Sequence, residues 1–409
     1  MGNWREVTLK DICTKIGDGL HGTPNYDLSG EYYFINGNNL VNGKILFKED
    51  TKRISHDGYQ NHKKDLNDRT LLVSINGTIG NVAEYNNEKC ILGKSACYLN
   101  VCDEVDKIYV KYILYNNNFQ YYIAKTYTGT TIKNVSLKDI RNYTFNLPPL
   151  QEQKAIAETL SCLDDKIELN QKMNKNLEEQ AQAIFKSWFV DFEPFGGTMP
   201  SDWIETNLED IACLYNGYSY KGNELQSSNM AMATIKNFSR QGGFKQDGYK
   251  EIIPSDKIKD FHYANIFDIL VAHTDLTQNA DIIGNAEMIM TTLNYSKIVL
   301  SMDLVKVAPK NNFNHFLLAS ILKNNEFKKH ALGYVNGTTV LHLSKKALKE
   351  YTVYLPKDIS TLNILCETLE SFYRKISNNI IETETLKQIR DTLLPKLMSG
   401  EVRVPFGEG

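Results

Sequence analysis

The sequence predicts an α+β fold: two similar domains joined by two long antiparallel helices that pair as a coiled coil. Three observations predict it. The chain has 409 residues, too many for one ordinary domain. It repeats itself with a period of about 200 residues, which indicates duplicated domains. After each copy, the spacing of apolar residues becomes that of a heptad repeat.

The composition is that of a globular protein, with 42% hydrophobic and 23% charged residues. No run of about 18 apolar residues could span a bilayer, so we expect no membrane partner. Residues Met1 to Lys10 lack the basic and apolar segments of an export signal, so a cytoplasmic location is the default expectation. The seven cysteines form neither a CxxC pair nor a metal-binding cluster, and we expect ordinary, reduced, buried thiols.

The net charge of −3 is not that of a strongly basic nucleic-acid binder. The acidic excess lies in residues 151–194 and 358–409, whereas 1–150 and 195–357 are close to neutral. If the chain binds DNA, a basic face is therefore segregated on each large segment, or partner subunits neutralise much of the phosphate charge.

The duplication is visible along the whole chain. The matched segments are Trp4-Arg-Glu-Val-Thr-Leu9-Lys-Asp11-Ile12 with Trp203-Ile-Glu-Thr-Asn-Leu208-Glu-Asp210-Ile211, Leu71-Leu-Val with Ile269-Leu-Val, Gly80-Asn81 with Gly284-Asn285, and Gly129-Thr-Thr131 with Gly337-Thr-Thr339. The spacing between matched positions drifts from 199 residues at the start to 208 near the end, as insertions in loops would cause. We therefore expect two heads of similar fold and different surface.

Each head is expected to be α+β with a curved sheet. Short β-branched and aromatic runs alternate with Gly/Asn turns, for example at Tyr32–Ile35, Leu71–Ile75 and Ile298–Leu300. Helical stretches at Val110–Tyr115 and Phe316–Leu322 interrupt them.

Each head is followed by a predicted long helix with a heptad seam. The first seam comprises Leu160, Leu163, Ile167, Asn170, Asn174, Leu177, Ala181 and Ile184, and the second Leu369, Phe372, Ile376, Asn379, Thr383, Leu386, Arg390, Leu393 and Leu397. Asn170 and Asn379 hold the same seam position, where a buried polar residue would fix register and partner. The alternative is that each helix packs on its own head and both asparagines face water.

The length of these helices favours pairing. A helix from 160 to 188 rises roughly 42 Å, more than a small head needs for its own core. Two such helices could pair antiparallel and hold the heads about one DNA turn, 34–36 Å, apart. Rod length would then set the spacing of two half-sites.

The linking segments resemble the specificity subunits of Type I restriction-modification systems. The resemblance lies in Leu147-Pro-Pro-Leu-Gln-Glu-Gln153, Leu163-Asp-Asp-Lys-Ile167-Glu-Leu-Asn170, Ile184-Phe-Lys-Ser-Trp188-Phe-Val-Asp191 and Leu393-Leu-Pro-Lys-Leu-Met-Ser-Gly400. Gly17-Asp-Gly-Leu-His21-Gly-Thr-Pro24 and Ser74-Ile-Asn-Gly77-Thr-Ile-Gly80 are similar to the family's recognition loops. The second head offers Tyr215-Asn-Gly-Tyr-Ser-Tyr-Lys221 in place of the His21 loop, which leaves a shared role for that loop in doubt.

The resemblance implies four segments: target recognition domain 1 (1–148), a central conserved helical region (149–194), target recognition domain 2 (195–356) and a C-terminal conserved helical region (357–409). It implies that each head reads one half of a bipartite, asymmetric site in double-stranded DNA. It further implies partnership with two methyltransferase (M) subunits, which the restriction (R) subunits join. S-adenosylmethionine would be held by the methyltransferase subunit, with no cofactor in this chain.

No chemistry of the chain's own is expected. An adenine methyltransferase needs a polar residue followed by Pro-Pro and an aromatic ring, whereas Asn146-Leu-Pro148-Pro149-Leu150 has an intruding leucine and no ring. We interpret it as the start of a helix. We predict no catalytic residue and no metal site, so a single-chain methyltransferase is disfavoured. A coiled-coil adaptor whose heads bind proteins remains the alternative from another class.

Candidate DNA contacts lie on loops rich in Gly, Asn and Thr. They are His21, Thr23, Asn38, Asn39, Asn76, Thr78, Lys94, Thr130, Thr131 and Lys133 in the first head, and Lys221, Lys236, Asn237, His273, Thr274, Thr338 and Thr339 in the second. Asn39 and Asn237 could each bind adenine through two hydrogen bonds. For any one residue, a structural role in a turn is at least as good an interpretation. Ser136 resembles a helix cap.

Overall fold

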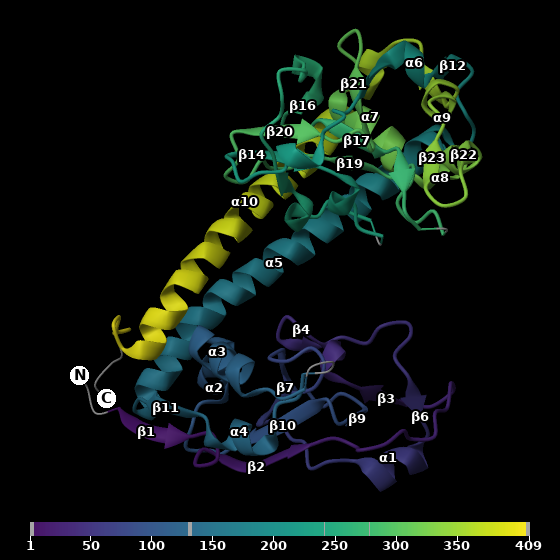
Figure 1. The fold of residues 1–409 in the computed structure, drawn as a ribbon. Coiled ribbons are helices and arrows are strands. Elements are labelled where there is room, and N and C mark those ends of the chain that lie inside the picture. The colour runs from purple at the N-terminus through teal and green to yellow at the C-terminus, as the bar shows by residue number, and fades with distance from the viewer. Residues whose placement is uncertain (1–3, 130–132, 241, 278, 406–409) are drawn as a thin grey trace. The chain divides into compact units, whose positions relative to one another are not determined.

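The structure, a computed structural model, describes residues 4–129, 133–240, 242–277 and 279–405. Its internal contacts divide the chain into two compact units: unit 1 (Met1–Lys166 with Leu386–Gly409) and unit 2 (Ile167–Thr385). Each unit contains one head and part of two long helices, α5 (Leu150–Phe189) and α10 (Asn363–Ser399) (Figure 1). The predicted fold class is confirmed, whereas the four segment boundaries stay a prediction.

The head of unit 1 is built on an antiparallel sheet with the strand order β2-β10-β7-β8. All five residues of β7 are buried because the strand has a core on each face. Leu71 and Val73 pack in the core that includes the helices, and Leu72 packs in a second core with Ile35 and Leu92. The alternation of side chains along a strand sends them to opposite faces.

The elements of this head are β1 (Arg5–Thr8), β2 (Cys13–Asp18), β3 (Tyr32–Ile35), η1 (Gly37–Asn39), β4 (Leu40–Val41), β5 (Lys44–Ile45), β6 (Arg53–Ile54), α1 (His56–His62), β7 (Thr70–Ser74), β8 (Val82–Glu84), β9 (Cys90–Leu92), β10 (Ala96–Val101), α2 (Lys107–Tyr115), α3 (Asn117–Thr126), α4 (Leu137–Asn142) and β11 (Thr144–Leu147). Strand β3 runs parallel to β9 and antiparallel to β6, and β1 pairs with β11. Ser136 caps α4 by accepting a hydrogen bond from the Asp139 backbone N–H at 3.1 Å, as predicted.

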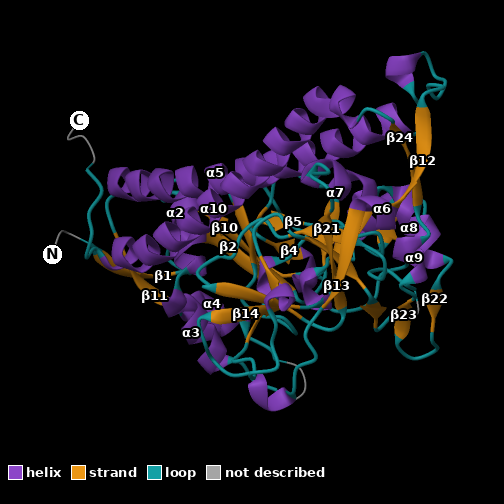
Figure 2. Ribbon diagram, turned by 90° about the horizontal axis from the view of Figure 1, so that it is seen from above, coloured by secondary structure: helices purple, strands orange, loops and turns teal. Residues whose placement is uncertain are grey.

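The head of unit 2 repeats this architecture. Its main sheet has the order β13-β21-β17-β19, and β17 again divides its side chains between two cores, with Ile269 and Val271 in one and Leu270 in the other. Strand β14 runs parallel to β20, as β3 runs parallel to β9. The predicted duplication is therefore a duplication of fold. Figure 2 shows that both heads combine strands with helices.

The elements of this head are η2 (Glu193–Phe195), β12 (Trp203–Asn207), α6 (Leu208–Ile211), β13 (Ala212–Asn216), η3 (Gly222–Glu224), β14 (Met230–Ala233), η4 (Ile235–Asn237), η5 (Gln246–Gly248), β15 (Lys250–Glu251), η6 (Asp260–His262), β16 (Tyr263–Ala264), β17 (Ile269–Ala272), β18 (Thr274–Asp275), β19 (Ala286–Met288), β20 (Lys297–Leu300), β21 (Leu304–Pro309), α7 (His315–Lys323), α8 (Asn325–Leu332), β22 (Val335–Asn336), β23 (Leu341–Leu343), α9 (Lys346–Lys349), β24 (Thr352–Pro356) and η7 (Ile359–Leu362).

Helices α5 and α10 pair antiparallel. In unit 2, the Nδ2 group of Asn379 donates to Asn174 Oδ1 at 2.8 Å, and the Nδ2 group of Asn170 lies 3.5 Å from Thr383 Oγ1. Residue numbers therefore fall along α5 as they rise along α10, which makes the pair antiparallel. In unit 1, Arg390 Nη1 donates to Asp164 Oδ1 at 2.8 Å. Asn170 and Asn379 are fully buried, which excludes the alternative in which they face water.

The start of α5 follows from two prolines. Pro148 and Pro149 precede the first helical residue, where a missing backbone N–H costs nothing. The buried Gln153 side chain ties this turn to the head, because its Nε2 donates to the Pro148 carbonyl at 2.7 Å and its Oε1 accepts from the Asp106 backbone at 2.9 Å. The helix therefore begins ten residues before the first seam position that we assigned.

All seven cysteines are free thiols, and one expectation about them is wrong. Cys90, Cys97 and Cys366 are buried, and burial raises the pKa of Cys90 to about 12. Cys162 of α5, however, is exposed, and Cys13, Cys102 and Cys213 are only half-buried, so the expectation of buried thiols holds for three of the seven. Among the described residues, no helix combines the length and the apolar composition needed to cross a bilayer.

Candidate nucleic-acid interface

In unit 1, several predicted recognition loops meet at Ser95. The Ser95 hydroxyl accepts from the Gly37 backbone N–H and donates to Asn36 Oδ1, both at 2.9 Å. The Ser95 carbonyl accepts from the Ile75 backbone N–H at 2.9 Å. The turn that carries Asn38 and the loop that carries Asn76 and Thr78 are thus attached to one point at the end of β7.

Two further loops of unit 1 join the same surface. The Gly77 backbone N–H donates to the Lys133 carbonyl at 2.9 Å, and the Asn76 Nδ2 group donates to Asn134 Oδ1 at 3.1 Å. The Lys94 backbone N–H donates to the Leu20 carbonyl at 3.0 Å, which places Lys94 next to the His21 loop. The head thus gathers five segments that are distant in the sequence.

Unit 2 repeats this arrangement around Asp303. The His273 backbone N–H donates to the Asp303 carbonyl at 2.8 Å, as Ile75 donates to Ser95. The Leu343 backbone N–H donates to the His273 carbonyl at 2.9 Å, as Val135 donates to Ile75. The loop that contains Thr338 and Thr339 leads into β23, which pairs with Thr274 and Asp275 of β18.

The loop of the second head that corresponds to the His21 loop has a similar backbone path but carries different side chains. Gly19 and Gly217 each pass so close to a neighbouring carbonyl that a Cβ atom would lie 2.1 Å from Leu92 O or 1.9 Å from Ser301 O. Only glycine permits that approach in either copy. In the first head, His21 Nε2 lies 2.6 Å from Asp18 Oδ2, whereas the second carries Ser219 at the matching position.

Asn39 and Asn237 hold the two ends of a hairpin in their heads. Asn39 Oδ1 accepts from the Asn36 backbone and its Nδ2 donates to the Leu46 carbonyl, at 2.9 and 3.0 Å. Asn237 Oδ1 accepts from the Thr234 backbone at 2.9 Å, and its Nδ2 donates to the Lys245 carbonyl at 2.8 Å. Both side chains are buried and their amides are used internally. In this conformation neither can reach an adenine, so both have a structural role.

The other predicted contact residues differ in exposure. Thr274 is buried and donates to Asp303 Oδ1 at 3.1 Å, while Asn76 and His273 are half-buried. Thr130 and Thr131 lie outside the described residues. The exposed ones are His21, Thr23, Asn38, Thr78, Lys94, Lys133, Lys221, Lys236, Thr338 and Thr339.

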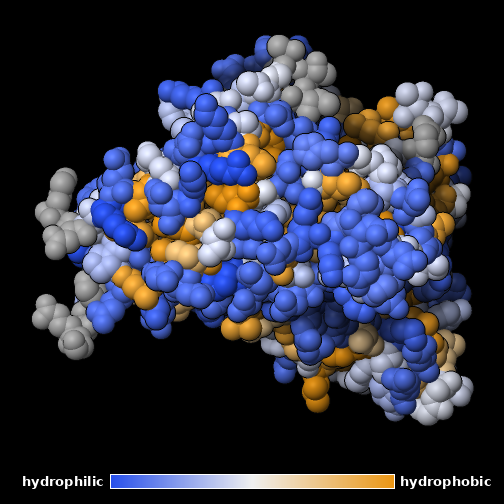
Figure 3. All heavy atoms as spheres, turned by 90° about the horizontal axis from the view of Figure 1, so that it is seen from below, coloured by the Kyte–Doolittle hydropathy of each residue, from blue (hydrophilic) through white to orange (hydrophobic). Residues whose placement is uncertain are grey.

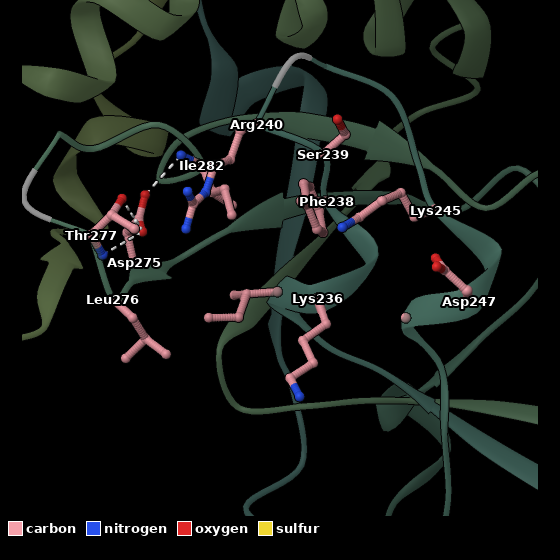
Figure 4. A pocket seen from close by; sticks show the side chains of 12 residues that line it. Lys236, Phe238, Ser239, Arg240, Lys245, Asp247, Asp275, Leu276, Thr277 and Ile282 are labelled. Atoms are coloured by element: carbon pink, nitrogen blue, oxygen red, sulfur yellow. Dashed lines mark hydrogen bonds between the residues drawn. The ribbon is translucent and has the colours of Figure 1, made fainter. Parts of the chain in front are cut away.

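A hollow of about 600 Å³ lies on unit 2 beside its hairpin. Lys236, Arg240 and Lys245 line it from the hairpin side, and Asp275, Leu276 and Thr277 from the facing loop (Figure 4). Lys236 was predicted, whereas Arg240 and Lys245 were missed. The signal that could have found them is the glycine pair 242–243, which marks a hairpin with a basic residue on each side.

Asp275 is the buried acid at this hollow, and its charge is satisfied internally. Burial alone would raise its pKa, but hydrogen bonds from the Ile282, Thr277 and Ile283 backbones and the Thr277 hydroxyl outweigh that effect and hold the pKa below its ordinary value. Four hydrogen bonds of 2.7–3.2 Å reach its two oxygens. Thr277, Ile282 and Ile283 of the facing loop are therefore held around a fixed carboxylate.

Lys328 supports the same loop from α8. Its ammonium group donates to the carbonyls of Ala280, at 3.1 Å, and of Ile283. Burial lowers the pKa of Lys328 to about 8, against the opposing effects of Asp275 and Asp281. The described residues of the loop are thus held by a carboxylate that accepts from their N–H groups and an ammonium group that donates to their carbonyls.

Hydrophilic residues cover most of the face drawn in Figure 3, with hydrophobic residues in scattered patches. Among the described residues, no group of three or more His, Cys, Asp or Glu side chains is placed to hold a metal ion. Each head instead presents polar loops gathered at one end of a sheet. This arrangement is that of a duplicated recognition protein.

The chain belongs to the Type I restriction-modification specificity family. The family model for the Type I restriction modification DNA specificity domain matches residues 1–179 and 200–388, once for each head. Members of this family are the subunits that recognise DNA sequence, and they do not carry out the catalysis.

Relatives match along nearly the whole chain. The chain is 26% identical to the Type I restriction enzyme MjaIX specificity subunit of Methanocaldococcus jannaschii, over 98% of this chain and 94% of the relative. It is 24% identical to the Type I restriction enzyme HindI specificity subunit of Haemophilus influenzae, over 98% and 100%. The crystal structure of the Type I restriction-modification S subunit from M. genitalium shares the fold, with a TM-score of 0.57 at 21% identity over 97% and 96% of the two chains.

Proposed function

We propose that each head of this chain reads one half of a bipartite, asymmetric DNA site. In this proposal the paired helices set the spacer between the half-sites and dock two methyltransferase subunits, which the restriction subunits join. The main observation behind the proposal is that the loops of the two heads share their backbone hydrogen bonds but carry different side chains at equivalent positions.

The differences fall where a base or a phosphate would be contacted. Lys94 and Ser95 of the first head correspond to Met302 and Asp303 of the second, because the backbones of Ser95 and Asp303 accept equivalent hydrogen bonds. The ammonium of Lys94 can donate to a guanine or to a phosphate, whereas the carboxylate of Asp303 can accept from a cytosine amino group. Two surfaces with different donors and acceptors favour two different half-sites.

The methyl transfer itself is assigned to the partner. S-adenosylmethionine would bind the methyltransferase subunit, which would methylate an adenine within the site that this chain selects. The chain's contribution is then positional, since its loops fix which adenine the partner reaches.

The test combines this chain with a methyltransferase subunit and S-adenosylmethionine. We expect no methylation by the chain alone and site-specific adenine methylation by the complex, with two unlike half-sites when the modified positions are mapped in the source genome. Methylation by the chain alone would contradict the proposal. Retention on DNA with no sequence preference in a footprint would favour the adaptor with protein-binding heads.

A further inference from the structure

The hollow of unit 2 has a basic lining that its own structure does not neutralise. We infer that this hollow binds a phosphate group of the DNA backbone at the second half-site, through Lys236, Arg240 and Lys245. This inference rests on the proposed function and deepens it, because it names the group on the DNA that the hollow takes.

The three cations are exposed and weakly paired. Arg240 Nε lies 4.0 Å from Asp281 Oδ2, and the Arg240 side chain is 66% exposed, so this ion pair contributes little. Among the described residues, no carboxylate lies within ion-pair distance of Lys236 or Lys245. Hydrated, unpaired cations are the groups that replace counterions on DNA.

The acids of the hollow do not cancel this charge. Asp275 is 1% exposed, and its oxygens already accept hydrogen bonds from Thr277, Ile282 and Ile283. Asp247 is the one exposed carboxylate in the lining, against the three cations. An incoming phosphate therefore meets a net positive rim and the apolar side chain of Leu276, which is 69% exposed.

The described parts of the hairpin, 236–240 and 242–245, are held in place before any ligand arrives. The Gly243 backbone N–H donates to Glu287 Oε1 at 2.6 Å, and the Lys245 backbone N–H donates to the Asn237 carbonyl at 2.6 Å. At Gly248, a Cβ atom would lie 2.5 Å from the Asn237 backbone nitrogen, so glycine allows the two turns to pack together. A prearranged hairpin reduces the entropy lost when DNA binds.

The first head does not repeat this charge pattern. At the positions of Lys236 and Lys245 it carries Asn38 and Leu46, the latter 47% exposed. At these two positions the basic side chains are therefore a property of the second head and not of the shared fold. A phosphate contact carries no sequence information but fixes how a head is oriented on the duplex. This local segregation of basic residues also fits a chain whose net charge is −3.

The test uses the full-length chain and a duplex of arbitrary sequence, with binding measured by fluorescence anisotropy at several salt concentrations. In the variant Lys236→Gln/Arg240→Gln/Lys245→Gln, the slope of log K against log salt should fall in magnitude by about 0.9, because the slope changes by that amount for each phosphate that the protein neutralises and the hollow takes one. Lys236→Arg/Lys245→Arg should keep the wild-type slope. Lys349→Gln, an exposed lysine of α9 in the same head, is the matched control and should keep it as well.

A triple variant with the wild-type slope would overturn the inference while leaving the proposed function intact, provided that the wild-type chain binds the duplex. Loss of binding to a methyltransferase subunit at an unchanged DNA slope would also overturn it, because the hollow would then receive an acidic protein surface. If the wild-type chain binds no duplex, alone or with its methyltransferase partner, the proposed function fails first and the inference with it.

Discussion

Asn170 and Asn379 lie opposite one another in the seam between α5 and α10. The Nδ2 group of Asn170 lies 3.5 Å from the Asn379 carbonyl and donates to Glu382 Oε2 at 2.9 Å, while the Nδ2 group of Asn379 donates to Asn174 Oδ1 at 2.8 Å. Asn170 Oδ1 is buried and accepts no hydrogen bond from the residues that the structure describes. Each asparagine thus meets polar groups only when the two helices have this register, so the pair selects the register at some cost in stability.

Replacing both asparagines by leucine should separate stability from register. We expect Asn170→Leu/Asn379→Leu to unfold in urea with an unchanged or higher free energy, by about 1 kcal/mol, because it removes a buried unsatisfied carbonyl. We also expect a mixture of oligomers by size exclusion with light scattering, since an apolar seam tolerates other pairings.

The control for that experiment is Asn176→Leu, an exposed asparagine of the same helix. It should leave both the free energy of unfolding and the oligomeric state as they are. A double seam variant that remains a single species of wild-type size would show that other contacts fix the register.

Lys323 should be essential to the stability of unit 2. Its buried ammonium lies 2.8 Å from Glu287 Oε2 and 3.7 Å from Glu178 Oε1. Burial alone would lower the pKa of Lys323, but the two carboxylates raise it overall, so the lysine stays charged. Lys323→Met would leave Glu287 buried without a cation, and we expect it to lower the free energy of unfolding by about 3–5 kcal/mol in urea.

The comparison for Lys323 is Lys329→Met. Lys329 lies 2.7 Å from Glu326, but both side chains are more than half exposed, so the loss should be below about 1 kcal/mol. Adding Glu287→Gln to Lys323→Met should recover part of the loss, because it removes the uncompensated charge. Equal effects of the two lysine substitutions would contradict the role assigned to the buried ion pair.

His273 should make the stability of unit 2 sensitive to mild acid. Burial, and then the nearby Lys345 and His342, lower its pKa below the ordinary 6.5. Below pH 6.5 the unfolded chain therefore binds a proton that the folded chain does not, so stability falls as the pH drops from 6.5 toward the folded-state pKa. His273→Gln should lose less stability than the wild type between pH 7.5 and 5.5 in urea titrations.

A matched variant is His56→Gln, which removes an exposed histidine of α1. Its stability should follow the pH dependence of the wild type. If His273→Gln does so too, protonation of His273 does not oppose folding.

The sequence predicted the features that depend on local patterns of residues: the helix seam, the duplicated heads and the start of α5. The heptad spacing identified the seam, and Leu160, Ile167 and Leu369 are buried in it. The duplication predicted two heads of the same α+β fold, because each copy repeats the same alternation of apolar residues. The start of α5 at Leu150, directly after Pro148-Pro149, agrees with the interpretation of that motif as a helix start.

The candidate interface was harder to predict, because it depends on contacts between distant segments. Asn39 and Asn237 have the right chemistry for adenine, and only the folded hairpins show that backbone groups occupy their amides. Ser95 and Asp303 were missed, since nothing in their local sequence says that loops from elsewhere converge on them. The direction in which a side chain points is a tertiary property, so predicted loop residues divide into exposed and buried ones only in the structure.

The last prediction concerns the spacer of the DNA site. The chain passes between its compact units after Lys166 in α5 and after Thr385 in α10. Four residues inserted at both positions, in the 163–184 seam and opposite it, lengthen each helix by about 6 Å. Because both helices gain the same length, the pairing on either side of the insertion keeps its register. If the helices set the spacer, the preferred spacer should grow by roughly two base pairs with both half-sites unchanged.

Methylation mapping in the presence of the methyltransferase subunit measures both quantities at once. The matched control inserts four Gly/Ser residues after Gly197, which is exposed and has open space around it, in the segment that follows η2. That insertion lengthens the chain without lengthening either helix, so the spacer should not change. Altered half-sites at a constant spacer would contradict the prediction that helix length sets the spacer. The insertion would then have changed how the heads read bases without changing the distance between the two half-sites.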